Sequence, residues 1–195
     1  MIRLFDILLS FFGLLILLPF FLIIASIIKL DSSGPIFFTQ LRVGRWNADF
    51  YLFKFRTMRP NAEKLGQLTV GGKDPRITEI GYVLRKYKLD ELPQLINVFL
   101  GHMSLVGPRP EVRKYVSLYS KDQRKVLSVK PGVTDYASIE YSDENEILGG
   151  ADDPEKLYIE KVMVEKLELN QKFISNPDLA SYFTVILLTV KKIIG

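Results

Sequence analysis

LRKYKLDELPQLINVFLGHMSLVGPRPE, residues 84–111, holds the densest mixture of acid, base, proline and glycine in the chain. Apolar residues recur in it at helical spacing, which predicts an amphipathic helix over most of Leu89–Leu100. Asp90 stands at the expected start of this helix. Pro93 falls in the first turn, where a missing N–H costs least, and Gly101 ends the helix. The stretch therefore predicts a helix that opens on an acidic pair.

The Asp90–Glu91 pair has two interpretations. In the structural one, Asp90 is a good N-cap and Glu91 suits the positive end of the helix dipole. In the functional one, the helix start attracts phosphate, and the guanidinium groups of Arg85 and Arg109 add donors suited to phosphate oxygens. A carboxylate there repels phosphate unless a divalent cation lies between them or the carboxylate itself attacks. The residues alone leave both interpretations open.

LDELPQLINVFLGHMSLVGPRP resembles the signature of the bacterial sugar transferases, the small monotopic phosphoglycosyl transferases that begin the assembly of membrane-linked glycans. The resemblance has no gaps. It extends upstream through KDPRIT at 73–78 and downstream through KPGVT at 130–134. Together with the N-terminal segment it covers the chain from Arg3 to Thr134.

The resemblance implies transfer of a sugar-1-phosphate from a UDP-sugar to undecaprenyl phosphate, which gives undecaprenyl-diphosphate-sugar and UMP. Asp90 matches the family's nucleophile, which forms a phosphosugar-aspartate intermediate. Glu91 would help Asp90 to hold Mg²⁺ or assist the lipid phosphate, and Arg85 and Arg109 would bind phosphate oxygens. The expected setting is the cytoplasmic face of the bacterial inner membrane, as the first membrane step of a polysaccharide or glycoprotein pathway.

Composition narrows the alternatives. The chain has 195 residues, a formal charge of +4 and no cysteine, so disulfides and thiol chemistry are excluded. Its single histidine, His102, cannot form a multi-histidine metal site, and we expect it at the surface or outside the reacting groups. The modest basic excess suits membrane lipid or anionic substrates and does not indicate nucleic acid. A non-enzymatic adaptor that binds anionic lipid is the alternative function.

The N-terminal segment is a membrane helix by composition. Residues Ile7–Ile28 carry no charge, and a helix of that length is about 33 Å, just enough to cross a bilayer core. A cleaved signal peptide fits poorly because the apolar run is too long. Pro19 kinks the segment, which on the residues alone is compatible with a spanning helix or one that turns back. The resemblance implies a re-entrant helix over 1–30. The family often places serine before the proline, whereas Leu18 precedes it here, so other contacts must hold the bend.

Residues 31–195 are expected to form one catalytic domain on the cytoplasmic face, α+β and mostly helical, with a short β-hairpin and amphipathic interfacial helices. The hairpin is predicted from Ile36–Leu41 and Tyr51–Phe55. Lys54 and Arg56 at its end are either solvated charges on an edge strand or contacts to headgroups or phosphate. Thr78 is expected to cap the helix that delivers Arg85.

The remaining segments have weaker patterns. Glu111–Val126 is predicted to be a charged amphipathic helix, and Lys130–Gly132 a turn. Asp153 and Pro154 begin a helix that would carry i,i+4 ion pairs, Lys156–Glu160 and Lys161–Glu165. Leu179–Val190 is too short to span a membrane; it can pack in the core, at the interface or in a homodimer. The candidate segments for sugar choice are Asn61–Pro75 and Val133–Glu146, and the second lacks the arginine common in the family.

Overall fold

The computed structural model describes residues 1–60, 62, 74–175 and 178–194. This part of the chain is mostly helical, with two small two-stranded sheets and one long apolar N-terminal helix, so the α+β, mostly helical prediction is confirmed in that form. Most of the candidate loop Asn61–Pro75 lies outside the described residues. The helices and strands are α1 Ile2–Asp31, β1 Phe37–Val43, β2 Asp49–Phe55, α2 Glu79–Lys86, α3 Gln94–Leu100, β3 Ser104–Val106, α4 Arg113–Val116, β4 Gly132–Thr134, α5 Tyr136–Glu140, α6 Glu144–Gly149, α7 Pro154–Leu157, α8 Met163–Ser175 and α9 Leu179–Ile194.

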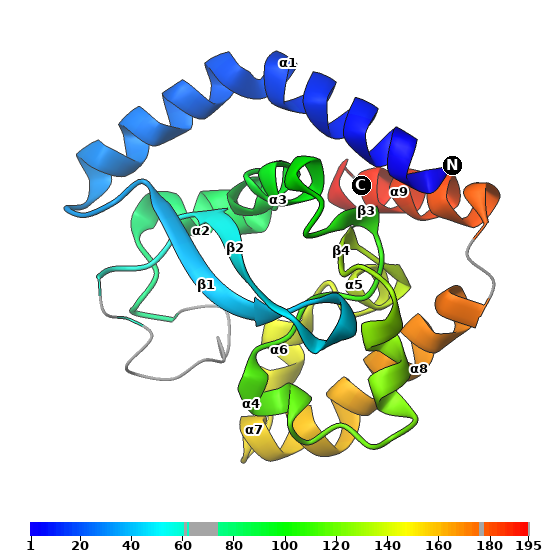
Figure 1. Ribbon diagram of the computed structural model, residues 1–195. Helices are drawn as coiled ribbons and strands as arrows, with labels where there is room; N and C mark the ends of the chain where they lie inside the picture. Colours follow the sequence, from blue (N-terminus) through cyan, green and yellow to red (C-terminus); the bar gives the residue numbers. More distant parts are fainter. Residues whose placement is uncertain (61, 63–73, 176–177, 195) are drawn as a thin grey trace.

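Helix α1 bows over the rest of the molecule (Figure 1). Its first turns lie beside α9, its middle passes over α3, and its far end lies next to α2. It is long and apolar enough to cross a membrane, and only 17% of its most apolar window is buried, which is unlike the core helix of a soluble protein. The side that faces the domain buries Asp6, Ser10, Phe21, Ile24 and Ile28. The opposite side exposes a continuous row of leucine, isoleucine and phenylalanine.

The predicted hairpin is confirmed. Strands β1 and β2 pair antiparallel, from Phe37 opposite Phe55 to Val43 opposite Asp49. Neither of the two cations at its end is a solvated charge, and their contact with headgroups or phosphate stays a prediction. Arg56 is buried and donates to the carbonyls of Ile28, Ser32 and Ser33, where α1 ends. Because those carbonyls lack helical partners, the guanidinium caps the far end of α1.

The helix predicted over most of Leu89–Leu100 is confirmed from Gln94 to Leu100, but it does not begin at Asp90. The chain forms a 3₁₀ turn at Leu89–Glu91 and then begins α3 at Gln94, with Pro93 directly before it. Pro93 has no N–H to continue the helical ladder, so the two segments stay separate. Asp90 makes no side-chain cap at this turn, and Gly101 ends α3 with φ of 90°, as predicted.

The helix predicted over Glu111–Val126 is wrong. Only α4 and a 3₁₀ segment, Gln123–Ser128, form there. Ser120 and Gln123 exchange side-chain to backbone hydrogen bonds between them, and this turn replaces the helical ladder. The broken path lets Tyr115, Val116, Tyr119 and Val126 all enter one apolar core.

A parallel pair, β3 with β4, was not predicted. Gly132 was expected in a turn, but it pairs with Ser104 in this sheet. Just after β3 and just before β4, the two backbones approach so closely that a Cβ on Gly107 would lie 2.5 Å from the carbonyl oxygen of Lys130. Glycine is required there for lack of space.

The C-terminal helices pack around the core that α4 enters. Asp153 caps α7 through the backbone N–H of Lys156, as predicted. A π-helical turn at Tyr158–Val162 then shifts the helical register, and the i,i+4 pairs predicted across it do not form among the described ion pairs. Helix α9 buries Tyr182 and Val185 against β3 and α1, while Leu187 and Val190 stay exposed.

Candidate active site

The predicted site residues come together where α2 meets α3. Thr78 caps α2 as predicted, accepting a hydrogen bond from the backbone N–H of Gly81. The helix delivers Arg85, and Lys88, in a left-handed conformation, turns the chain into the 3₁₀ turn. That turn carries Asp90 and Glu91, whose side chains are largely buried at 6% and 9% exposure. Buried carboxylates need compensating charge or hydrogen bonds, so their surroundings decide what they can do.

Glu91 is held by two cations. Lys54 of β2 donates to Oε1 at 2.8 Å, and Arg109 donates through Nη1 to Oε2 at 3.0 Å and through Nη2 to Oε1. Burial alone would raise the pKa of Glu91, but the charges of Arg109 and Lys54 outweigh it and hold the pKa well below its usual value. Glu91 is therefore a fixed negative charge with both oxygens engaged.

Asp90 has a different environment. Its carboxylate accepts no hydrogen bond from the residues that the structure describes. Burial raises the pKa of Asp90; Lys54 acts against this, and the neighbouring charge of Glu91 adds to it. Adjacent carboxylates with opposite pKa shifts can divide two chemical tasks between them.

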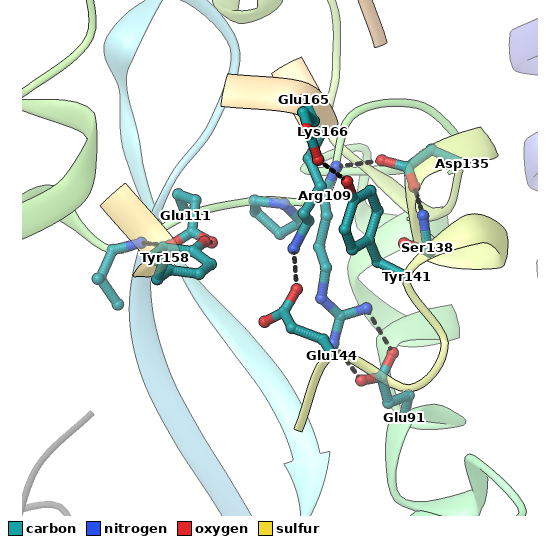
Figure 2. A network of polar contacts seen from close by, with 12 residues as sticks. Glu91, Arg109, Glu111, Asp135, Ser138, Tyr141, Glu144, Tyr158, Glu165 and Lys166 are labelled. Carbon is teal, nitrogen blue, oxygen red and sulfur yellow. Dashed lines mark hydrogen bonds and ion pairs between the residues drawn. The ribbon is translucent and has the colours of Figure 1, made fainter. Parts of the chain in front are cut away.

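Arg109 is fixed at both ends (Figure 2). Its backbone N–H donates to Asp135 Oδ2 at 2.9 Å, and its guanidinium reaches Glu91. Prolines on either side restrict its backbone. The charge of Glu91 raises the pKa of Arg109, so the guanidinium stays charged. About a third of the side chain, 34%, remains exposed, which leaves guanidinium surface for an anion.

Arg85 approaches the pair from α2. Its Nε donates to Thr57 Oγ1 at 2.9 Å, and its charge acts on Asp90. Burial lowers the pKa of Arg85, while the Asp90 charge raises it. Arg109 bonds to Glu91 and the charge of Arg85 acts on Asp90, so both arginines lie near the acidic pair; their binding of phosphate stays a prediction.

Sequence reasoning missed two residues that build this site. Lys54 was considered only as a solvated charge or as a contact to headgroups or phosphate, yet it lies against Glu91. Asn97, fully buried on α3, accepts from the backbone N–H of Phe53 at 2.9 Å and donates to the carbonyl of Tyr51 at 2.7 Å. These bonds tie α3 to β2 beside Lys54. Lys54 could have been suspected because it is a cation within a strand of aromatic residues. An asparagine on a predicted helix gives no comparable signal in the sequence.

His102 is exposed, with its ring 5.9 Å from that of Phe50, as expected for a residue outside the reacting groups. Two small hollows adjoin Arg109, and both are lined by Glu111 and Tyr119 as well. Neither is lined by Asp90 or Glu91. The hollows therefore lie on the far side of Arg109, toward the helical core.

The acidic pair can take part in a metal site only with help from a ligand. No cluster of three or more histidine, cysteine, aspartate or glutamate side chains occurs among residues 1–60, 62, 74–175 and 178–194 that could hold an ion. Mg²⁺ is commonly bound through one or two carboxylates together with substrate phosphates and water. Asp90, whose oxygens accept no hydrogen bond from the described residues, fits that arrangement, whereas both oxygens of Glu91 are already bonded by Lys54 and Arg109.

A long apolar helix lies on a domain whose buried acid pair is surrounded by lysine and arginine, an arrangement that suits a membrane-associated protein. A family model described as bacterial sugar transferase matches residues 1–195. The chain belongs to the bacterial sugar transferase family, which confirms the resemblance and the prediction of a transferase.

Three relatives illustrate the similarity. UDP-N-acetylgalactosamine-undecaprenyl-phosphate N-acetylgalactosaminephosphotransferase of Aeromonas hydrophila is 41% identical over 137 residues, which is 69% of this chain and 32% of the relative. Exopolysaccharide production protein PSS of Rhizobium leguminosarum bv. phaseoli is 43% identical, over 70% of this chain and 72% of the relative. UDP-glucose:undecaprenyl-phosphate glucose-1-phosphate transferase of Xanthomonas campestris pv. campestris is 41% identical, over 69% of this chain and 28% of the relative. The match thus spans less than a third of the first and third relatives.

Proposed function

We propose that this chain transfers a sugar-1-phosphate from a UDP-sugar to undecaprenyl phosphate, giving undecaprenyl-diphosphate-sugar and UMP. The observation that carries the proposal is the contrast between two adjacent carboxylates. Glu91 is clamped by Lys54 and Arg109, whereas Asp90 has no hydrogen-bond donor among the described residues. An uncommitted carboxylate surrounded by cations suits attack on phosphorus. The family, and relatives whose names state this kind of transfer, add support.

The transfer divides into two displacements at phosphorus. An Asp90 oxygen attacks the phosphorus that bears the sugar, the bond to the bridging oxygen breaks, and UMP leaves with the electron pair. An oxygen of the lipid phosphate then attacks the phosphosugar-aspartate, and the Asp90 carboxylate is released. An ionised carboxylate needs no separate base for the first displacement, and a phosphate anion needs none for the second. Glu91 keeps Arg109 in place throughout.

The cations of the site counter the charge of the diphosphate. Arg85 and the exposed part of Arg109 would bind phosphate oxygens from either side of the acidic pair. Mg²⁺ would be held by Asp90 and the diphosphate, with the charge of Glu91 beside it, and it would neutralise the leaving group. Without such neutralisation, repulsion between Asp90 and the donor would oppose the first attack.

The membrane arrangement that suits this reaction is re-entrant. It is supported by the contacts at the two ends of α1: Asp6 bonds to β3 and α9, and Arg56 bonds to the carbonyls of Ile28 and Ser32. A helix tied at both ends to one domain cannot have its ends on opposite faces of a bilayer. Residues 1–30 would thus enter the inner membrane and return at Pro19, with 31–195 on the cytoplasmic face.

Helix α9 lies beside the first turns of α1 (Figure 1) and exposes Leu187, Val190 and Ile193, which suits placement at the interface with membrane lipid. The phosphate of undecaprenyl phosphate lies at that depth, so the lipid substrate would reach the acidic pair without leaving the bilayer. A homodimer through α9 stays a prediction.

The deciding experiment is a screen for UMP release. The purified full chain, in vesicles with polyprenyl phosphate and Mg²⁺, is incubated with a panel of UDP-sugars. We expect UMP and a polyprenyl-diphosphate-sugar from at least one donor, and both should be lost when EDTA is added. Without the lipid phosphate, UMP release should stop after the first turnover of each enzyme and no lipid product should form. Binding to anionic vesicles without UMP from any donor would favour the adaptor function instead.

A further inference from the structure

Asp6 is a buried carboxylate in the first turns of an apolar helix, with 2% of its surface exposed. Its Oδ1 accepts three hydrogen bonds of 2.9 Å, from Ser104 Oγ, the backbone N–H of Leu105 and the hydroxyl of Tyr182. A buried charge is costly unless several donors compensate it. Two of the three donors belong to β3, so this carboxylate joins the membrane helix to that strand.

Strand β3 leads directly to Arg109. The chain continues through Gly107 and Pro108, and a hydrogen bond to the neighbouring segment 132–135 holds each residue from Gly107 to Arg109. The N–H of Gly107 donates to the carbonyl of Thr134 at 3.0 Å, the N–H of Gly132 donates to the carbonyl of Pro108 at 3.0 Å, and the N–H of Arg109 donates to Asp135. Only three residues separate Leu105 from Arg109, and the prolines on either side of Arg109 restrict φ. A shift of β3 must therefore move Arg109.

A second contact reinforces this connection. Arg3, one turn before Asp6, donates to the carbonyls of Val98 and Phe99 at 2.6 and 3.0 Å, at the end of α3. The first two turns of α1 thus contact both α3, the helix that follows Glu91 in the chain, and β3, the strand that precedes Arg109.

We propose that Asp6 is a positioning residue for the transfer reaction: through β3 it sets the place of Arg109 against Glu91. The membrane helix is then part of the active-site framework as well as an anchor. The inference rests on the proposed function for its kinetic test, and on backbone geometry for its structural test.

The kinetic test is a double-mutant cycle on the full chain in vesicles, with the donor that the screen identifies. Asp6→Leu is expected to lower kcat/KM by about tenfold or more, roughly the equivalent of losing two hydrogen bonds that position a catalytic group. Asp6→Asn keeps Oδ1 as an acceptor and should recover most of the loss. In an Arg109→Ala background, Asp6→Leu should cost less than about twofold further, because its target is gone. Equal losses in both backgrounds would overturn the proposal.

Two milder variants keep the test decisive if Asp6→Leu fails to fold. Ser104→Ala and Tyr182→Phe each remove one 2.9 Å donor from the same oxygen, but only Ser104 belongs to β3. We expect about a fivefold loss of kcat/KM from Ser104→Ala, the equivalent of one hydrogen bond, and little from Tyr182→Phe. Ser10→Ala is the control, because Ser10 is equally buried and bonds only within its own helix. Equal losses from Ser104→Ala and Tyr182→Phe would reject the role of β3.

Hydrogen exchange separates this inference from the proposed function. Exchange at the backbone N–H groups of Gly107 and Arg109 should accelerate in Ser104→Ala and Asp6→Leu and stay unchanged in Tyr182→Phe and Ser10→Ala. A wild-type chain that releases no UMP would reject the function, while the exchange pattern would still decide whether Asp6 controls the segment that carries Arg109. Unchanged exchange in Asp6→Leu would overturn the inference.

Discussion

Lys54 and Glu91, 37 residues apart, form an ion pair in which Nζ lies 2.8 Å from Oε1. The pair joins the hairpin to the turn that carries both carboxylates, and Asn97 holds the adjacent backbone of β2. Burial lowers the pKa of Lys54, while the charges of Glu91 and Asp90 raise it. One lysine thus acts on both acids at once.

Replacing Lys54 with methionine should move the acid limb of the kcat/KM profile to higher pH. Burial and Glu91 raise the pKa of Asp90, while Lys54, Arg85 and Lys88 lower it. Removing Lys54 therefore raises that pKa further, and the ionised nucleophile is lost at a higher pH. The check is UMP release across a pH series with Mg²⁺ constant. Lys54→Arg, which keeps the charge, is the control. A limb that stays in place in Lys54→Met would contradict the effect of Lys54 on Asp90.

Asp90→Asn should abolish turnover without unfolding the protein. We expect a loss of at least about 10³-fold in kcat, typical of removing a nucleophile. Because burial raises the pKa of Asp90, its ionised form is disfavoured by folding at neutral pH, and a neutral asparagine should leave the melting temperature unchanged or higher. Asp122→Asn, at an exposed position, is the matched control. Robust UMP release from pure Asp90→Asn would reject the nucleophile assignment.

Gly107→Ala should destabilise the segment before Arg109. Its Cβ would lie 2.5 Å from the carbonyl oxygen of Lys130, so β3 and β4 must separate. We expect a loss of about 1–3 kcal/mol in unfolding free energy, typical of overpacking, together with lower activity. At Gly150 the nearest atom to a new Cβ is 3.8 Å away, so Gly150→Ala should be tolerated. Denaturant unfolding in detergent compares the two, and equal stability would show that the strands can separate freely.

Both ends of α1 should label from the same side of the membrane. The chain has no cysteine, so single replacements report without background. Leu4, 59% exposed, and Ser33, also exposed, flank the apolar run. In oriented membrane vesicles, Leu4→Cys and Ser33→Cys should react with an impermeant thiol reagent from the cytoplasmic face only. Reaction of the two positions from opposite faces would establish a spanning helix and reject the re-entrant proposal.

Local sequence signals predicted the parts of the fold that depend on near neighbours. Thr78 and Asp153 cap helices through N–H groups within three residues, and Gly101 adopts the left-handed conformation that glycine allows. The helix predicted over Glu111–Val126 failed because its apolar residues serve a distant core, which favours a broken path over a regular helix. The free energy that helix propensity contributes is small compared with that of burying four apolar side chains.

By itself, the sequence determined the family, the apolar leader, the hairpin and the acidic pair with its two arginines, because each is written in consecutive residues. Only the tertiary structure decided how the pair is divided. Lys54 and Arg109 reach Glu91 from other segments and leave Asp90 uncommitted. It likewise decided that Asp6 serves β3 and Arg56 caps the far end of α1. The energies of buried charges depend on partners brought close by folding, and no spacing along the chain encodes those distances.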